Sequence, residues 1–364
     1  MKKNILKVLV SIILIFTTIT TTSSAFAFEE SYTPFEGVSS IFTIRPLADD
    51  IKGTEEDWTL WSEEKLERYW YETRVEPREL NAEFMIELHQ GLQYMGLPHI
   101  NFGEITPELI LEIQEALDWA NSLNLDFSSY YSGFYRNEHS RELQSISPLM
   151  LPDYTPLQGL VARLSIFDGV SLLQVNTAGN LGNLSIAEGR QIYPHNYRDG
   201  SQWMRNDAFR HFTWSLRSAR QIGWRNAMII TNNYEFAPMM LNAYTEYFNR
   251  IREELLTNPW LSNWTYLQIR ASAEGAALSF ALDKRERIAN EAAVSDAAFR
   301  RVFGDDSIMD FWNNWAGFAF IGSADHINAF YDEIERGVII LGECYTHTRS
   351  RINRLRVQGY WRHF

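Results

Sequence analysis

The densest group of reactive side chains in this sequence lies between Asn206 and Trp214. This short segment contains an acid, a guanidinium, an imidazole and an indole. Residues three and four apart share one face of a helix, so Asp207 precedes His211 by one turn. An acid beside an imidazole fixes its tautomer and raises its basicity, which suits acid–base catalysis and metal ligation. Arg210 could hold an anionic oxygen or pair with a carboxylate. Alternatively, Asp207 caps the helix and His211 is a core histidine whose hydrogen bonds are satisfied.

A second polar stripe has the spacing of one helical face and consists of Asp310, Asn313, Asn314 and Gly317. Asparagine side chains compete with the backbone for hydrogen bonds inside a helix, so two adjacent asparagines there indicate a tertiary demand. Gly317 would let a ligand or another backbone come close. The stripe is equally compatible with a hydrogen-bond network between helices that performs no chemistry.

Glu235 is the third candidate, because it follows a polar break, residues 231–234, in helix-forming sequence. Its carboxylate could act as a base or a metal ligand, and the alternative is an isolated surface or structural carboxylate. We expect the three helix faces to converge on one cavity. The predicted catalytic residues are His211, Asp207, Arg210, Glu235 and Asp310, and the predicted substrate-binding residues are Trp214, Asn313, Asn314 and Gly317.

The elements that position these residues are predicted to be helices, from apolar spacing and capping residues. In the first half of the chain they cover 62–73, 82–95 and a segment from 107 onward. In the second half they cover 156–173, 207–222, 225–257, 264–303, 307–320 and 325–336. Segments rich in glycine and asparagine predict loops at 179–183 and 193–200. The apolar residues at 337–341 predict a short strand or an extended segment. The predicted fold class is therefore mainly α, a multi-helix globular domain preceded by a smaller N-terminal helical region.

The beginning of the chain has the features of a secretory signal peptide. Lysines at 2, 3 and 7 precede an apolar run, 8–16, that is too short to span a bilayer, and an A-x-A site predicts cleavage after Ala27. An uncleaved anchor is the alternative. The regions that we expect are a signal peptide (1–27), an extended leader (28–53), an N-terminal helical region (54–150), a main helical domain (156–345) and a basic C-terminal tail (346–364). We accordingly expect a secreted, extracellular protein without a transmembrane segment after cleavage.

The composition limits the classes of function. The formal net charge of −13 becomes −16 without the three lysines of the signal peptide, which does not favour nucleic acid or an anionic membrane as the main partner. Cys344 is the only cysteine, so an intramolecular disulfide, a thiolate zinc site and an Fe–S cluster are excluded. It is interpreted as a structural thiol, with a catalytic thiol as the alternative. The expected partner is a small-molecule or cell-envelope ligand of unknown identity.

Taken together, the polar segments resemble the family called domain of unknown function 6973, which occurs in exported and toxin-like bacterial proteins. The family's Asp-Ala-Phe-Arg-His element, with a Trp three residues on, is matched by 207–211 and Trp214, and an Ile-Gly follows at 222–223. Its Asp-x-x-Asn-Asn-x-x-Gly helix is matched by 310–317, and the resemblance spans residues 160–342. It implies a mostly helical domain and no established reaction.

The chain departs from the family pattern at one position that bears on metal binding. Glu235 matches the Glu of the family's His-Glu pair, whereas Tyr234 stands where the family has His. This substitution weakens any model with two histidines on one metal. One His, one Glu and one Asp are still compatible with a divalent ion, so the cofactor is unknown and a metal is not favoured.

The leading functional hypothesis is a secreted hydrolase. His211 acts as the general base or acid and is oriented by Asp207, Arg210 holds an oxygen of the substrate, and the second carboxylate comes from a later helix. Asn313 and Asn314 donate hydrogen bonds to the substrate in this hypothesis. The alternative is a non-catalytic exported interaction module, or a toxin-type effector, in which the polar clusters are a structural network.

Overall fold

The computed structural model describes residues 78–123, 156–193, 200–262, 264–319, 326–335, 339, 345–358 and 361–364. Within these residues the chain forms ten α-helices and no strand, which confirms the predicted mainly α fold class. None of the described helices combines the length and the apolar character needed to cross a bilayer. The predicted signal peptide, leader and 62–73 helix lie outside the described residues, as does all of 337–341 except Ile339.

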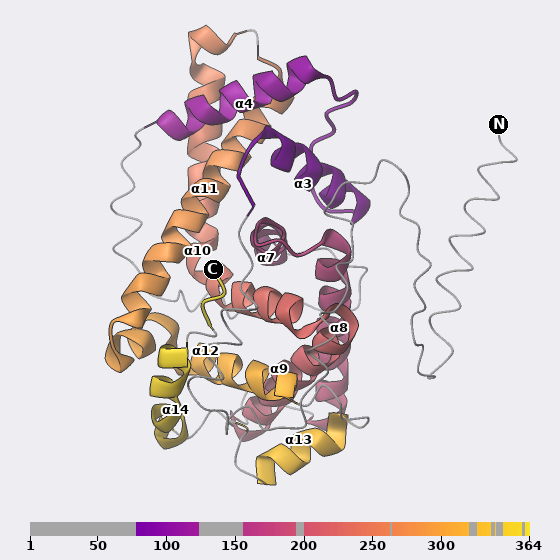
Figure 1. Cartoon of the computed structure of the whole chain (residues 1–364), viewed down its shortest axis with the longest axis vertical. Helices are drawn as coiled ribbons and strands as arrows, with labels where there is room; N and C mark the ends of the chain where they lie inside the picture. The colour runs from indigo at the N-terminus through magenta and orange to yellow at the C-terminus, as the bar shows by residue number, and fades with distance from the viewer. Residues whose placement is uncertain are drawn as a thin grey trace, which may run out of the picture. The chain divides into compact units, whose positions relative to one another are not determined.

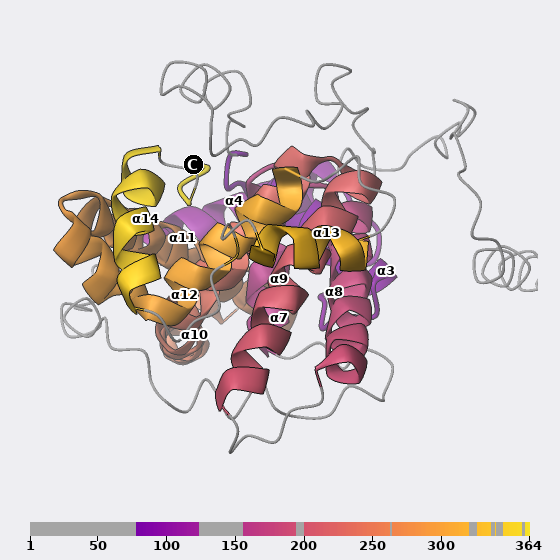
Figure 2. The same ribbon diagram turned by 90° about the horizontal axis from the view of Figure 1, so that it is seen from below.

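The helices are shown in Figure 1 in chain order from indigo to yellow. Their bounds are α3 (Ala82–Tyr94), α4 (Pro107–Ser122), α7 (Pro156–Phe167), α8 (Leu172–Ile192), α9 (Gly200–Ile222), α10 (Trp224–Thr257), α11 (Tyr266–Ala293), α12 (Asp296–Ala319), α13 (His326–Glu335) and α14 (Tyr345–Gln358). The closest helix pairs are α10 with α11, α8 with α9, and α9 with α12. Figure 2 shows α8 and α9 side by side.

The first two described helices begin where the sequence predicts them. The Asn81 side chain accepts a hydrogen bond from the backbone N–H of Phe84 at 2.9 Å. The Thr106 hydroxyl accepts one from the N–H of Leu109 at 3.3 Å, and a proline follows in the first turn of α4. These caps satisfy N–H groups that have no partner within the helix, which is why short local patterns located both ends correctly.

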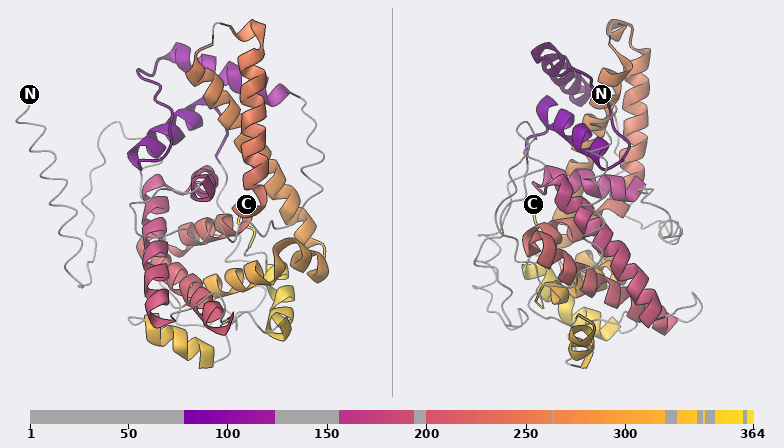
Figure 3. Two further views of the ribbon diagram at one scale, coloured as in Figure 1. Left: turned by 180° about the vertical axis from the view of Figure 1, so that it is seen from behind. Right: turned by 90° about the vertical axis from the view of Figure 1, so that its right-hand side faces the viewer.

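Helices α3 and α4 share their core with the later helices. Met85, Leu88 and Leu117 belong to the same cluster of buried hydrophobic residues as Ile229 and Phe311. Helix α4 packs against α11, and Figure 3 shows the same helices from two further sides. Among the described residues, the predicted division between an N-terminal region and a main domain is therefore not a division between two cores.

The segment predicted as one helix over 156–173 is two helices. Helix α7 ends before Gly169, whose φ of 88° lies in the left-handed region that glycine adopts without strain. Helix α8 then begins with a reciprocal capping box between Ser171 and Gln174. The apolar pattern runs through this turn because residues on both sides of it are buried, so periodicity alone did not reveal the break.

The loop predicted at 179–183 is wrong, because these residues lie inside α8. A Cβ atom at Gly182 would lie 3.3 Å from Nε1 of Trp214, so the glycine leaves room for the indole ring. The indole N–H in turn donates to the backbone oxygen of Ala178 at 2.8 Å. Packing of α9 against α8 therefore overrides the poor helix propensity of glycine and asparagine.

The helix predicted over 264–303 is also interrupted. Helix α11 ends at Ala293, and α12 begins at Asp296 and bends at Gly304, where φ is 70°. The bend turns the second part of α12 so that residues 307–319 pack against α9. Glycine at a positive φ avoids the strain that a Cβ atom would cause there.

The segment predicted as a basic C-terminal tail contains a helix and buried aromatic residues. Residues 345–358 form α14, which packs against α12. After it, Trp361 and His363 are buried, with exposed fractions of 1% and 2%. The sequence suggested a tail because of its arginines, but Arg356 pairs with Asp296 at 2.7 Å on the surface while the aromatic residues enter the core.

Candidate functional site

The two predicted polar segments meet where α9 packs against α12. His211, on α9, is 1% exposed, and Asn314, on α12, is also 1% exposed. The Asn314 Oδ1 atom accepts hydrogen bonds from His211 Nδ1 at 3.2 Å and from the Ser215 hydroxyl at 2.7 Å. With Nδ1 as the donor, the neutral imidazole carries its lone pair on Nε2.

Gly317 explains how closely the two helices approach. A Cβ atom at this position would lie 2.3 Å from the backbone oxygen of Phe212, a distance that real structures do not tolerate. The close approach predicted at Gly317 therefore involves the backbone of α9. This contact brings the polar side chains of α12 within hydrogen-bonding reach of His211.

Two carboxyl groups and a guanidinium lie at the Nε2 side of the imidazole. The distances from His211 Nε2 are 3.3 Å to Asp310 Oδ1 and 3.9 Å to Asp207 Oδ1. Nε2 also contacts Arg210 Nη2 at 2.9 Å, and the same Nη2 forms an ion pair with Asp207 Oδ1. We call Asp207, Arg210, His211 and Asp310 the His211 cluster.

These contacts change two roles predicted from the sequence. Asp207 lies well inside α9, which begins at Gly200, so it is not a helix cap. It pairs with Arg210, and the residue that orients the imidazole is Asn314 rather than Asp207. The helical spacing of Asp207 and His211 brings the two side chains close, but the partner that holds the ring comes from the other helix.

Several acidic groups act on Arg210, the cation of this cluster. Burial acts to lower the pKa of Arg210, but the surrounding negative charge, to which Asp207 contributes most, raises that pKa above its ordinary value. The other contributors are Tyr234, Asp310 and Glu235. Glu235 is itself buried on α10, so all three predicted helix faces contribute to one electrostatic environment.

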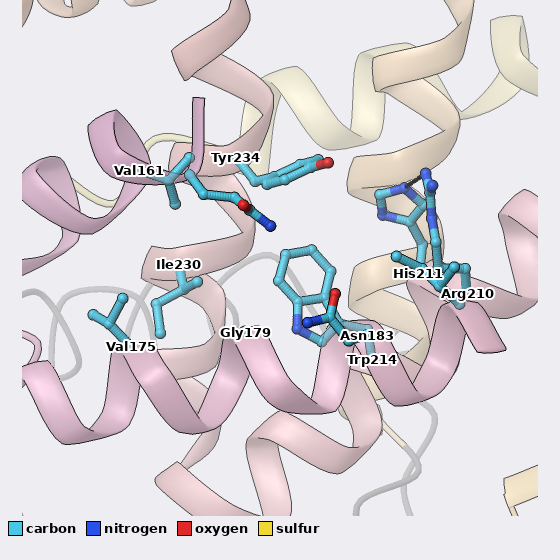
Figure 4. A pocket seen from close by; sticks show the side chains of 12 residues that line it. Val161, Val175, Gly179, Asn183, Arg210, His211, Trp214, Ile230 and Tyr234 are labelled. Atoms are coloured by element: carbon cyan, nitrogen blue, oxygen red, sulfur yellow. Dashed lines mark hydrogen bonds between the residues drawn. The ribbon is translucent and has the colours of Figure 1, made fainter. Parts of the chain in front are cut away.

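A pocket of about 80 Å³ borders the cluster between α7, α8, α9 and α10. Its walls are mostly apolar and include Val161, Val175, Ile186 and Ile230, while His211, Arg210, Trp214 and Tyr234 line its other end. Figure 4 shows the hydroxyl end of Tyr234 turned toward the side where His211 and Arg210 lie. Burial raises the pKa of this phenol, so it stays a hydrogen-bond donor at neutral pH.

The predicted site residues fall into three groups. His211, Arg210 and Trp214 line the pocket. Asp207, Asp310 and Glu235 are buried. Their negative charges act on Arg210, which lines the pocket. The remaining three, Asn313, Asn314 and Gly317, are not among the lining residues. His211 and Ser215 both contact Oδ1 of Asn314, so the predicted donation to a substrate would come from its Nδ2 amide and stays a prediction.

One wall of the pocket was not predicted from the sequence. Gly179 and Gly182 line it from α8, in the segment that was predicted to be a loop. Their spacing places both on one helix face, which is the signal that could have identified them. Tyr234 was noted as a departure from the family pattern but was not predicted to line a site.

Comparison with known proteins adds no assignment. The chain matches no family model, and neither curated proteins nor solved structures give a significant match. The resemblance to the domain of unknown function 6973 family therefore stays a prediction that depends on the polar segments alone. Function is accordingly inferred from the His211 cluster and the pocket beside it.

Proposed function

We propose that the protein is a hydrolase whose reaction takes place where the pocket meets the His211 cluster. One observation carries this proposal: an imidazole and a guanidinium line the same small, mostly apolar pocket. The Nδ1 atom of the imidazole is held by Asn314, which leaves the lone pair on Nε2. A positioned base and a fixed cation beside a pocket are the groups that hydrolysis of an ester bond needs.

The chemical roles follow from the atoms that are available. His211 Nε2 accepts a proton from a water molecule as that water attacks the carbonyl carbon or phosphorus of the ester. Arg210 donates hydrogen bonds to the oxygen on which negative charge develops. The proton on Nε2 is then transferred to the departing oxygen, which restores the neutral imidazole. Asp207 and Asp310 stabilise the imidazolium that forms between these steps, because their carboxyl oxygens lie close to Nε2.

The lining of the pocket supports a substrate with a slender apolar group. Val161, Val175 and Ile230 form apolar walls, and Gly179 and Gly182 of α8 line the pocket without side chains that would fill it. Trp214 and Tyr234 meet edge to face, with ring centroids 5.4 Å apart, between these walls and the polar end. Such rings pack against acyl or alkyl groups. We therefore favour carboxylic or phosphoric esters of small apolar groups as substrates.

Export is part of the proposal. The predicted signal peptide would deliver an acidic protein to the outside of the cell, where a cell-envelope ester is a reasonable substrate class. A toxin-type effector would use the same chemistry in a different setting. N-terminal sequencing of the protein secreted from its host checks this part, with Phe28 as the expected first residue.

The proposal is tested with the purified mature chain and three substrates, para-nitrophenyl acetate, para-nitrophenyl butyrate and bis(para-nitrophenyl) phosphate. We expect His211→Gln to lower kcat/KM by about 10²–10⁴-fold, because it removes a positioned proton acceptor. His99→Gln is the control, since this histidine contacts the backbone oxygen of Leu97 and lies outside the pocket. Absence of hydrolysis in the wild type, or an unchanged rate in His211→Gln, would contradict the proposal.

A structural network without chemistry is the second candidate. The observation that favours it is the burial of Asn314 and its bridge between His211 and Ser215, which fixes α9 against α12. In this case His211→Gln and Asn314→Leu lower the melting temperature by several degrees, and no ester is cleaved. A His211→Gln variant that melts near the wild-type temperature and has lost activity excludes this candidate.

A further inference from the structure

We infer that Asp207, His211 and Asp310 bind a divalent metal ion, which takes over the position held here by Nη2 of Arg210. The inference rests on the proposed hydrolase function and deepens it, because it names the agent that activates the attacking water, whose proton then passes to the departing oxygen. The roles of three residues change: the Nε2 lone pair of His211 binds the ion and does not receive a proton from water, and Asp207 and Asp310 are ligands of the ion.

The geometry of the three side chains fits a common ion. Each offers one ligand atom, and these atoms all lie within 4.8 Å of one another. Ligands at about 2.1 Å from an ion are separated by about 3.0–3.4 Å in octahedral or tetrahedral coordination. His211 Nε2 and Asp310 Oδ1, at 3.3 Å, already have this separation. Asp207 Oδ1, at 3.9 Å from Nε2, needs to approach Nε2 by roughly half an ångström, and the two carboxylates also need to come together from a separation of up to 4.8 Å.

The electrostatics of the site call for a cation at this point. Three atoms that bear lone pairs converge in a buried region, an arrangement that is unfavourable without positive charge between them. Arg210 supplies one such charge by contacting both Asp207 and His211. Besides Asp207, both Asp310 and Glu235 contribute to the field around Arg210.

The support of the imidazole also matches metal ligation. A histidine that binds a metal through one ring nitrogen usually donates its other N–H to an oxygen, which fixes the ring and its tautomer. Asn314 Oδ1 accepts that hydrogen bond from His211 and is itself held by Ser215. One imidazole nitrogen and two carboxylate oxygens suit Mn²⁺ or Zn²⁺.

The sequence interpretation did not favour a metal because Tyr234 replaces a histidine. The structure provides a different third ligand, since Asp310 approaches His211 from α12. Tyr234 is turned toward the same end of the pocket, where its hydroxyl can donate to a substrate.

Arg210 is the residue that must move when the ion binds. Its side chain is 22% exposed and lines the pocket, so the guanidinium can swing from Asp207 toward the pocket. There it meets the anionic oxygen of a substrate, as the proposed function requires. Binding of the ion and release of Arg210 are therefore coupled.

If the ion displaces Arg210 from its ligands, removal of a ligand should weaken ion binding, whereas removal of Arg210 should not. After treatment with EDTA, the wild-type mature protein is titrated with ZnCl₂ and, separately, MnCl₂ in a calorimeter. We expect a single ion per chain, and at least about a tenfold loss of affinity in Asp310→Asn and Asp207→Asn. Arg210→Met is expected to bind at least as tightly as the wild type, because a competing cation has been removed. Asp283→Asn, at an exposed ion pair with Arg287, is the control and should not change affinity.

Thermal unfolding provides a second readout that does not depend on activity. Saturating Zn²⁺ or Mn²⁺ should raise the Tm of the wild type by more than that of Asp310→Asn, since an ion that binds only the folded state stabilises it in proportion to its affinity. Circular dichroism of each variant confirms that it is folded before the titration.

The outcomes separate this inference from the proposed function. No binding by the wild type, or equal binding by Asp310→Asn and the wild type, overturns the metal site, and so does loss of binding in folded Arg210→Met. Hydrolysis that is unaffected by EDTA also overturns it while leaving His211 as the base. Specific binding of the ion without hydrolysis of any ester supports the metal site and contradicts the proposed function.

Discussion

Two buried regions of this protein use the same kinds of residue and differ in charge balance. One is the His211 cluster, and the other is the Asp168 network, which consists of Asp168, Asn233, Arg285 and His363. Both combine aspartate, arginine and histidine, with an asparagine beside them, and both join helices that are distant in the chain. Burial and residue type therefore do not distinguish them.

The Asp168 network pairs one acid with one arginine. Asp168 accepts two hydrogen bonds from Arg285, at 2.6 and 2.8 Å, and one each from Asn233 and His363, both at 2.8 Å. Burial acts to raise the pKa of Asp168, but the charges of Arg285 and His363 and their hydrogen bonds hold it well below its ordinary value. This network fastens the end of α7 to α10, α11 and the C-terminal residues.

The His211 cluster differs, because several acids act on its one guanidinium, that of Arg210. They are Asp207, Asp310 and the nearby Glu235, and two members of the cluster line a pocket. None of the Asp168 network lines that pocket. The comparison teaches that a buried network serves stability when its charges match, whereas an excess of one sign beside a pocket indicates a site for a ligand of the other sign.

The largest expected effect is the loss of the balanced network. Asp168→Asn leaves Arg285 buried without its carboxylate, which typically costs about 3–5 kcal/mol of folding free energy. Unfolding in urea, followed by circular dichroism at neutral pH, measures this change. Asp283→Asn at the exposed pair with Arg287 is the matched control, with an expected change within about 0.5 kcal/mol. If Asp168→Asn lost as little folding free energy as Asp283→Asn, the Asp168 network would not stabilise the fold, and its contrast with the His211 cluster would fail.

The same network should govern the response to acid. A carboxyl group whose pKa is depressed in the folded state stabilises the fold above its ordinary pKa of about 3.9, and this contribution disappears as the pH falls further. Each such group changes the unfolding free energy by at most about 1.4 kcal/mol per pH unit. Asp168 and Glu274, whose pKa values Arg285 and Arg163 hold down despite burial, should both contribute.

The measurement is a series of unfolding curves between pH 6 and pH 3, a range set by the ordinary pKa of aspartate. Asp168→Asn should show a shallower fall of stability below about pH 4 than the wild type. His363 adds a loss that begins higher, below about pH 6.5, because burial lowers its pKa and the unfolded state then binds the proton. Identical slopes in the wild type and Asp168→Asn would show that this carboxyl does not link folding to pH.

The sequence predicted the parts of the fold that local patterns determine. Helix starts at Asn81 and Thr106 agree with the structure because each cap is a contact between near neighbours. The break after Phe167 was missed because apolar residues continue through it. The loop assigned to 179–183 was wrong because the reason for its glycines, the indole of Trp214, lies on another helix.

In the candidate site, too, the contacts within one helix were predicted from the sequence and the contacts between helices were not. Helical spacing correctly placed Asp207 and Arg210 beside His211, since those contacts lie within one helix. The partner that orients the imidazole, Asn314, lies on α12, and the spacing of neither helix indicates that they pair. Contacts between helices depend on how closely the backbones approach, which here is decided by Gly317.

A smaller effect is expected when the unbalanced cluster loses an acid. Asp310→Asn removes one carboxyl group from the vicinity of Asp207 and keeps the shape of the side chain. Because several acids lie close together there, we expect unchanged or slightly raised stability, by about 0–1 kcal/mol without added metal. Urea unfolding of EDTA-treated protein is the measurement, beside Asp168→Asn. A loss of about 3 kcal/mol or more would place Asp310 in the same structural class as Asp168.

An effect of similar, small size separates the pocket from the cluster. Gly179 lies inside α8 and lines the pocket, and a Cβ atom there would meet no atom within 4 Å. Gly179→Ala should therefore raise stability by about 0.5–1 kcal/mol, because alanine loses less conformational freedom in a helix. Gly182→Ala is the matched variant, since its Cβ would press on Trp214 and offset that gain.

Neither substitution touches the charges of the His211 cluster, so metal affinity should stay at the wild-type value in Gly179→Ala. The added methyl group narrows the pocket, and turnover of para-nitrophenyl butyrate should fall more than that of the acetate. Equal turnover ratios in the variant and the wild type would mean that the apolar group of the ester does not bind against α8. The cluster would then act on a substrate that reaches Arg210 by another path, and charge excess alone would distinguish it from the Asp168 network.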